Sequence, residues 1–218
     1  MIATMAALTW KRVRRGKTLW IAAVIAALPV LYAAVAGARD IDPSANGLFT
    51  IEELLLAVLP AMFVSASIGE DIEDKTAAYL WSRPVPRWQI VAGKLVTLVP
   101  LAIAFQLASQ IVAVAIGWGR FAEPASLVGL AAAVIAVSCV ATVISILVPK
   151  YGMALTLCYM LLFDLGVGEL PAQLREISIS YQARQIASGE IASPVVAMVM
   201  VGGLSLAIAL WRLRRLEA

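Results

Sequence analysis

The chain has 218 residues, of which 62% are hydrophobic and only 14% are charged, and its formal net charge is +3. Soluble domains are typically about half apolar and a quarter charged, so this composition excludes an ordinary soluble domain and indicates a chain that needs lipid as its solvent. Histidine is absent, which excludes most zinc sites and the usual general base.

Six apolar stretches approach the roughly 20 residues that a helix needs to cross the hydrocarbon core of a bilayer. They cover about residues 18–38, 50–68, 90–117, 126–148, 153–168 and 194–211. Helices are expected because lipid leaves an open strand no way to satisfy its backbone, and six short spans cannot close a barrel. Pro29 and Pro60 predict kinks in the first two spans. The sequence therefore predicts an all-α integral membrane protein, with residues 1–218 as one transmembrane domain.

The distribution of basic residues predicts the orientation. Thirteen of the 17 lysines and arginines lie in segments on the same side as the amino terminus; the other four are Arg39, Arg120, Arg175 and Arg184. Because cytoplasmic segments carry the excess of Lys and Arg, both termini are expected in the cytoplasm. The basic start, the apolar run and the tripeptide at 34–36 also fit a cleaved signal peptide, although the run exceeds the usual signal core of about 7–15 residues.

Residues 1–17 form the first polar segment. Apolar residues at Ile2, Met5, Leu8 and Trp10 precede five cations between positions 11 and 17. This pattern predicts a short helix lying in the inner interface with its cations near anionic head groups. An ordinary basic flank of the first span is the alternative.

Residues 69–93 form the longest connection on the cytoplasmic side. Acidic residues come first, where they suit the amino-terminal turn of a helix; they are Glu70, Asp71, Glu73 and Asp74. Residues 75–82 can continue that helix, with Ala77, Leu80 and Trp81 as an apolar face, and Pro84 and Pro86 end it. A charged amphipathic helix held between two spans suits the docking of a cytoplasmic partner, whereas the alternative is a solvated loop.

Residues 169–193 lie on the outer side. Leu170, Leu174, Ile177 and Tyr181 recur at helical spacing, which predicts an interfacial helix before the last span. The alternation of Ile and Ser over residues 177–181 permits a short strand instead.

Polar side chains inside the spans are costly and are often functional. Gln106, Ser109 and Gln110 share one face of the third span, where they could line a substrate path or hydrogen-bond a neighbouring helix. Asp164 lies about four residues from the outer end of the fifth span and could face an outer vestibule or pair with a basic residue such as Arg175.

Two further features of the spans carry expectations. Glu52 and Glu53 open the second span near the outer surface, where water is expected to reach them. Cys139 and Cys158 lie in apolar stretches and are expected to be small packing residues rather than a disulfide.

The long cytoplasmic connection also carries a motif. It combines an acidic helix start, a threonine, the pattern Ser-x-Pro-Val-x-Arg and a Gly-Lys pair that opens the next span. The matching residues are Glu70, Glu73, Thr76, Ser82, Pro84, Val85, Arg87, Gly93 and Lys94. This segment resembles the first inner loop of ABC type 2 transporter permeases. Lys75 and Ala77 depart from it, because the family often has glycine and leucine there.

The resemblance implies that this loop is a coupling helix seated in a groove of a separate ATP-binding cassette subunit. The residues expected to couple are Glu70, Asp71, Glu73, Asp74, Lys75, Thr76, Leu80, Trp81, Ser82, Arg83, Pro84 and Arg87. It further implies a second permease subunit, identical or related, and transport most naturally in the direction of export across the plasma (inner) membrane. ATP and magnesium are expected on the partner ATPase, with no cofactor, metal or nucleic acid bound by this chain. Gln106, Gln110 and Asp164 are the candidates for a substrate path.

Two other function classes share single features with this sequence. The pair Glu52-Glu53 is similar to the paired glutamates of intramembrane proteases of the CAAX-processing kind, but those sites also need histidines, which this chain lacks. We therefore do not expect an enzyme. An ion-coupled carrier or a membrane anchor without an ATPase partner is the second alternative, although a carrier usually shows repeated halves, and no repeat is evident.

Overall fold

The computed structural model describes residues 2–38, 45–73, 87–170 and 173–215. All regular structure in these ranges is helical. Six helical stretches in them are long and apolar enough to cross a membrane, which agrees with the number predicted. These stretches are Thr18–Ala36, Gly47–Gly69, Trp88–Trp118, Pro124–Leu147, Pro149–Gly168 and Ala192–Arg215.

The first span follows an amino-terminal helix and is itself in two pieces. Helix α1 (Ile2–Arg15) ends at a turn, and α2 (Thr18–Ala26) and α3 (Leu28–Ala38) then form the span. The break between them falls at Ala27, two residues before Pro29. A proline lacks an N–H, and its ring clashes with the carbonyl four residues earlier, which accounts for the interruption of the helix at this point.

The second span continues through its proline. Helix α4 (Ala45–Pro60) passes into a buried π-helical turn, η1 (Ala61–Ser65), and then into α5 (Ala66–Glu73). Phe63 in this turn stacks on Phe105, with ring centroids 6.0 Å apart. Turns of this kind are rare and concentrate at functional positions in helices. The second span is therefore one continuous helix with a π-helical turn near its middle.

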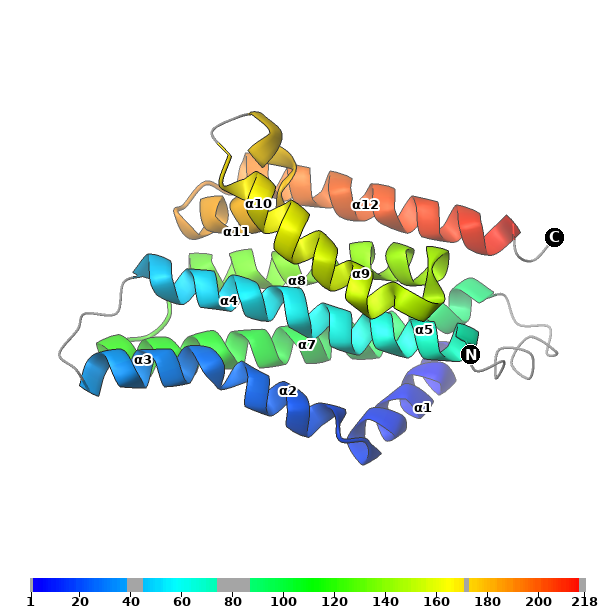
Figure 1. The fold of residues 1–218 in the computed structure, drawn as a ribbon, viewed down its shortest axis with the longest axis horizontal. Coiled ribbons are helices and arrows are strands. Elements are labelled where there is room, and N and C mark those ends of the chain that lie inside the picture. Colours follow the sequence, from blue (N-terminus) through cyan, green and yellow to red (C-terminus); the bar gives the residue numbers. More distant parts are fainter. Residues whose placement is uncertain (1, 39–44, 74–86, 171–172, 216–218) are drawn as a thin grey trace.

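The remaining elements complete a bundle whose long helices run along the longest axis of the molecule (Figure 1). They are α7 (Arg87–Trp118), α8 (Pro124–Leu147), η2 (Pro149–Tyr151), α9 (Gly152–Cys158), η3 (Tyr159–Asp164), α10 (Leu165–Gly168), η4 (Gln173–Ile177), α11 (Ile179–Ala187) and α12 (Ala192–Arg215). Both termini lie at one end, which we call the termini end; helix α11 lies at the opposite end, the α11 end (Figure 1).

Helix α8 occupies the centre, where it packs against α4, α7, α11 and α12. The core beside it contains the fully buried side chains of Leu56, Phe63, Leu98 and Leu130. Cys139 is a free, buried thiol on α8 and Cys158 is free and exposed, so neither forms a disulfide.

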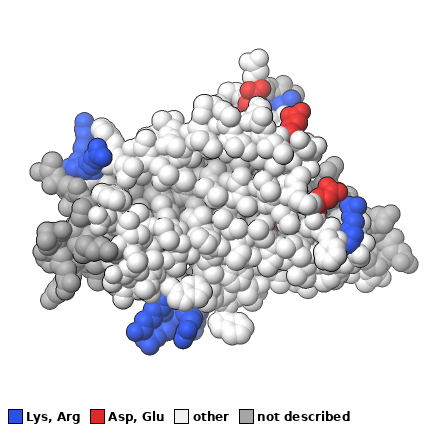
Figure 2. Space-filling model, turned by 180° about the vertical axis from the view of Figure 1, so that it is seen from behind, with Lys and Arg blue, Asp and Glu red and all other residues white. Residues whose placement is uncertain are grey.

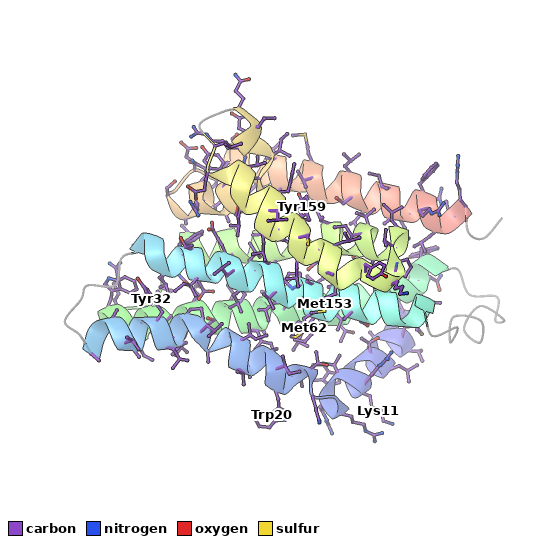
Figure 3. All side chains as sticks on the ribbon, in the orientation of Figure 1. Lys11, Trp20, Tyr32, Met62, Met153 and Tyr159 are labelled. Carbon is purple, nitrogen blue, oxygen red and sulfur yellow. The ribbon has the colours of Figure 1, made fainter. Side chains whose placement is uncertain are left out.

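The outward faces of the peripheral helices are apolar. Trp20, Val24, Val199 and Leu204 are each between 65% and 77% exposed, and Trp20 projects away from the bundle (Figure 3). Figure 2 shows charged side chains gathered toward the ends and at the α1 corner, with a broad uncharged surface between them. So large an exposed apolar surface is stable only in lipid.

Helix α1 folds back onto the beginning of α7. A Cβ atom on Gly93 would lie 2.7 Å from Cβ of Met5 and 3.0 Å from the carbonyl oxygen of Ile2. The hydroxyl of Thr97 also donates to the carbonyl oxygen of Ala6 over 3.1 Å. Glycine at position 93 therefore permits the close approach of the two helices.

Replacing Gly93 with leucine is expected to lower the free energy of unfolding by about 1–3 kcal/mol, because the added side chain forces α1 away from α7. The matched control is Gly203→Leu on α12, where an added Cβ meets nothing within 4 Å. Thermal unfolding in detergent, followed by tryptophan fluorescence, measures both variants. Equal melting temperatures for the two would show that α1 does not depend on this contact.

Candidate functional site

The predicted coupling residues fall only partly within the described structure. Glu70, Asp71 and Glu73 belong to α5, and Arg87 opens α7. Residues 74–86 lie outside the described residues; the predicted coupling residues among them are Asp74, Lys75, Thr76, Leu80, Trp81, Ser82, Arg83 and Pro84. The predicted helix start at Glu70 is wrong, because the second span continues without a break to Glu73. The three acids therefore lie within α5, beyond its first turn.

Close contacts hold together the two helices that flank this connection. Lys94 is almost fully buried, and its Nζ donates to the carbonyl oxygen of Ser67 on α5. A Cβ atom on Gly69 would lie 2.7 Å from the carbonyl oxygen of Pro149, so α5 also lies against η2. The Gly-Lys pair at 93–94 thus has a structural role. The glycine lets α1 pack closely on α7, and the lysine links α7 to α5 by a hydrogen bond.

An ion network joins three elements at the α11 end. Arg184 on α11 donates through Nε and Nη2 to the two carboxylate oxygens of Glu53 on α4, over 2.6 and 2.5 Å. Its Nη1 donates to Glu169 over 2.6 Å. The hydrogen bonds to Glu53 raise the pKa of Arg184 above its usual value, so the guanidinium stays charged. Sequence reasoning missed this network; the only signal was the presence of two arginines, Arg175 and Arg184, in an amphipathic outer segment.

Glu52, the neighbour of Glu53, has a different set of partners on α7. Gln106 donates from Nε2 to the Glu52 carboxylate over 2.7 Å and to its backbone carbonyl over 3.0 Å. Ser109 donates to the same carboxylate over 3.0 Å. Both glutamates are fully buried, so the expectation that water reaches them is wrong. Of the two uses considered for Gln106 and Ser109, hydrogen bonding to a neighbouring helix is the one present.

Asp164 binds the amino-terminal turn of α11. Its carboxylate accepts from the backbone N–H groups of Ile179 and Ser180, over 2.7 and 2.9 Å, and it is fully buried. Ser178 caps the same turn by accepting from the N–H of Tyr181 over 3.1 Å. The N–H groups that a helix start leaves free are satisfied in this way, and the negative charge faces the positive end of the helix dipole. Arg175, the suggested partner of Asp164, instead lies over the ring of Tyr181.

The outer segment is helical as predicted, but the residues that it buries are not those that the sequence pattern indicated. It forms the short 3₁₀ helix η4 and then α11, which excludes the strand alternative, and the chain is extended at Ser178 between them. Leu170, Leu174 and Ile177 are about half exposed, whereas the buried face of α11 carries Ile179, Ala183 and Ile186.

A cavity of about 590 Å³ opens at the α11 end beside the ion network. Its lining includes Phe49, Gln110, Val114, Trp118, Arg120, Phe121, Glu123, Glu169 and Arg184. Gln110 is 5% exposed. Of the three residues suggested for a substrate path, Gln110 borders this cavity. Gln106 lies one helical turn away along α7, where it donates a hydrogen bond to Glu52. Asp164 accepts hydrogen bonds from the first turn of α11. Their part in transport stays a prediction.

Residues 9–167 match the family model described as ABC-2 family transporter protein. The chain belongs to this family. The match covers more than half of the chain, from α1 to α10, and includes the long connection between α5 and α7 on which the resemblance was based. A comparison with curated proteins found no match.

Membership in the ABC-2 family confirms the resemblance to ABC type 2 transporter permeases. Together with the six apolar helices, it identifies the chain as a multi-pass membrane protein that belongs to a transporter family. Proteins of the ABC-2 permease family are components of membrane transporters and are not themselves catalytic. Among the described residues, no three His, Cys, Asp or Glu side chains are grouped so as to hold a metal ion.

Proposed function

We propose that this ABC-2 permease is the membrane subunit of an exporter driven by a separate ATP-binding cassette subunit. Two permease subunits, identical or related, pack together in the plasma (inner) membrane, and ATP with magnesium is bound by the two partner ATPases. The single observation that supports this function is the family match over residues 9–167. The excess of lysine and arginine on the side of the termini supports a cytoplasmic location for that side.

In this proposal residues 69–89 couple the two subunits. Force applied by the ATPase to this connection enters the bundle through α5 and α7, which are tied together by Lys94 and Ser67. Helix α5 continues through η1 into α4, so a displacement at the termini end is carried to the α11 end, where α4 bears Glu52 and Glu53. The π-helical turn provides the point at which the two halves of this span can readjust.

Helix α11 closes the far end of the bundle in this proposal. It is held to α4 by Arg184, to the fifth span by Asp164 and to α8 by close packing, since a Cβ on Gly129 would lie 2.7 Å from the carbonyl oxygen of Ala183. A transporter needs two packings of its spans that ligands can bias. The packing described here is the one in which α11 is braced by all three contacts.

The test is Glu73→Arg in the complete transporter, reconstituted in vesicles with its ATPase. ATP-driven transport is expected to fall roughly ten-fold, because a reversed charge at a docking surface is expected to cost about 1.4 kcal/mol of binding free energy between the two subunits. Insertion into the membrane should be unchanged. Glu190→Arg, which reverses an exposed acid at the other end of the molecule, is the matched control.

Unchanged ATP-driven transport in Glu73→Arg would contradict the coupling role. Transport that needs no ATPase at all would support the ion-coupled carrier instead.

A further inference from the structure

We propose that Glu52 is a proton-binding site: its carboxyl carries a proton, as a neutral acid, while α4 and α7 are packed together, and it releases that proton to water when the two helices separate. The inference goes beyond the proposed function, because it concerns this chain alone and needs no ATPase. It is carried by a comparison of the three fully buried carboxyls at the α11 end.

The three buried carboxyls have different partners. Glu53 accepts from the guanidinium of Arg184, which is a cation. Asp164 accepts from two backbone N–H groups at the positive end of α11. Glu52 accepts only from an amide and a hydroxyl, both neutral, and it lies in the interior of α4, where the helix dipole gives no help. A buried carboxyl without a compensating positive group is stable as the neutral acid and not as the anion.

The helices around Glu52 bring no cation to it. Helix α4 packs against α2, α3, α7, α8, α9 and the turns η1 and η3. The charged residues in these elements are Arg87 and Lys94 on α7 and Asp164 on η3. Both cations of α7 lie at its termini end, Lys94 about 18 Å from Gln106 along the helix at about 1.5 Å per residue.

Arg184 reaches α4 from α11, but its N–H groups bind other carboxylates. Nε and Nη2 donate to Glu53, and Nη1 donates to Glu169. One guanidinium thus already faces two carboxylates, so it has no charge left to balance a third. Within the described part of the chain, Glu52 has no counter-ion.

The surroundings of Glu52 accommodate a protonated carboxyl. The hydroxyl of Ser109 can accept as well as donate, so a neutral Glu52 can donate to Ser109 over the same 3.0 Å and still accept from Gln106. Hydrogens are scarce in this cluster, because the buried Oε1 of Gln106 has no hydrogen-bond partner among the described residues. A proton adds a hydrogen and removes a buried charge, and it does so without needing a cavity.

Separation of α4 from α7 would change the state of this acid. Once water solvates the carboxyl, the O–H bond breaks, the electron pair stays on the carboxylate and the proton passes to water. Packing the two helices together again takes a proton up. A cycle between the two packings therefore binds and releases one proton in each permease subunit, and raising the pH favours the packing in which water reaches Glu52.

Infrared spectroscopy of the full chain tests the packed state. The chain is measured at about pH 7 in dodecyl maltoside, a detergent that has no carbonyl group. A carbonyl stretching band of a protonated carboxyl is expected in the unchanged chain and should be lost in Glu52→Gln. Glu53→Gln, a change at the adjacent buried acid, and Glu190→Gln, at an exposed acid, should both keep the band.

Reversible unfolding in sodium dodecyl sulfate tests the release of the proton. Between about pH 6 and 8, the unfolding equilibrium constant of the unchanged chain should rise relative to that of Glu52→Gln by up to about ten-fold per pH unit, because unfolding releases one proton from Glu52. The variant keeps the shape of the side chain but cannot ionise, so it corrects for every other group that titrates.

Any of three results would overturn the proposal: no protonated-carboxyl band in the unchanged chain, a band that survives in Glu52→Gln, or parallel pH profiles of unfolding for the two proteins. The first of these needs no variant to fold. Because no ATPase is present, such a result leaves the coupling role intact. Conversely, normal transport in Glu73→Arg would remove the coupling role without changing the infrared band.

Discussion

Replacing Arg184 with methionine is expected to lower the free energy of unfolding by about 3 kcal/mol, since it leaves the carboxylate of Glu53 buried and without its cation. The Glu53 side chain is fully buried, whereas that of Arg184 is 38% exposed. Solvent therefore weakens the pair somewhat, and the expected loss lies at the low end of the range for buried pairs. Thermal and denaturant unfolding of the purified chain in detergent, followed by tryptophan fluorescence, measures the change.

A double variant separates the loss of the ion pair from general damage. Glu53→Leu combined with Arg184→Met removes both charges, so most of the lost stability should return. Arg175→Met is the matched control, because this arginine lies at the same end, where its guanidinium is over the ring of Tyr181. If Arg184→Met and Arg175→Met unfold alike, the buried pair does not hold α11 in place.

Replacing Asp164 with alanine is expected to cost about 2–4 kcal/mol, because the backbone N–H groups of Ile179 and Ser180 lose their acceptor inside the protein. The bonds involved are 2.7 and 2.9 Å long. The loss should be local at first, and hydrogen exchange at these two amides should accelerate by more than the average for α11. Unfolding curves and exchange measured by mass spectrometry give the two readings.

Glu176→Ala is the control for Asp164→Ala, since it removes an exposed acid from the preceding 3₁₀ helix. Surface changes of this kind usually alter stability by less than about 0.5 kcal/mol. Protection of the first turn of α11 that is unaltered in Asp164→Ala would mean that Ser178 alone suffices as its cap.

The membrane architecture followed from the sequence because it depends on local composition. Six apolar stretches were predicted and six are present, since the length of a span is set by the bilayer and the helical state by the need to satisfy the backbone in lipid. The family also followed from the sequence, because its motif lies within one continuous segment of residues 69–95 and needs no knowledge of packing.

The network at the α11 end was out of reach because it joins residues far apart in the chain. Glu53 and Arg184 are separated by 131 positions, and nothing local shows that they meet. The burial of Glu52 and Glu53 depends on α7 and α11 covering them, so the estimate of water access from their place in the span was wrong. The buried face of α11 was misjudged for another reason: Ser178 interrupts the helical period between η4 and α11.

The adjacent glutamates on α4 restrict how that helix can turn. Successive residues on a helix point about 100° apart, so Glu52 meets α7 while Glu53 meets α11. Rolling α4 by one residue in one direction would bring Ile51 against Gln106, and in the other direction would bring Leu54 against Arg184. Either step keeps one polar contact and replaces the other with an aliphatic side chain. The two adjacent glutamates therefore oppose rotation of α4 about its own axis. Helix α4 can still slide, tilt or move together with its neighbours.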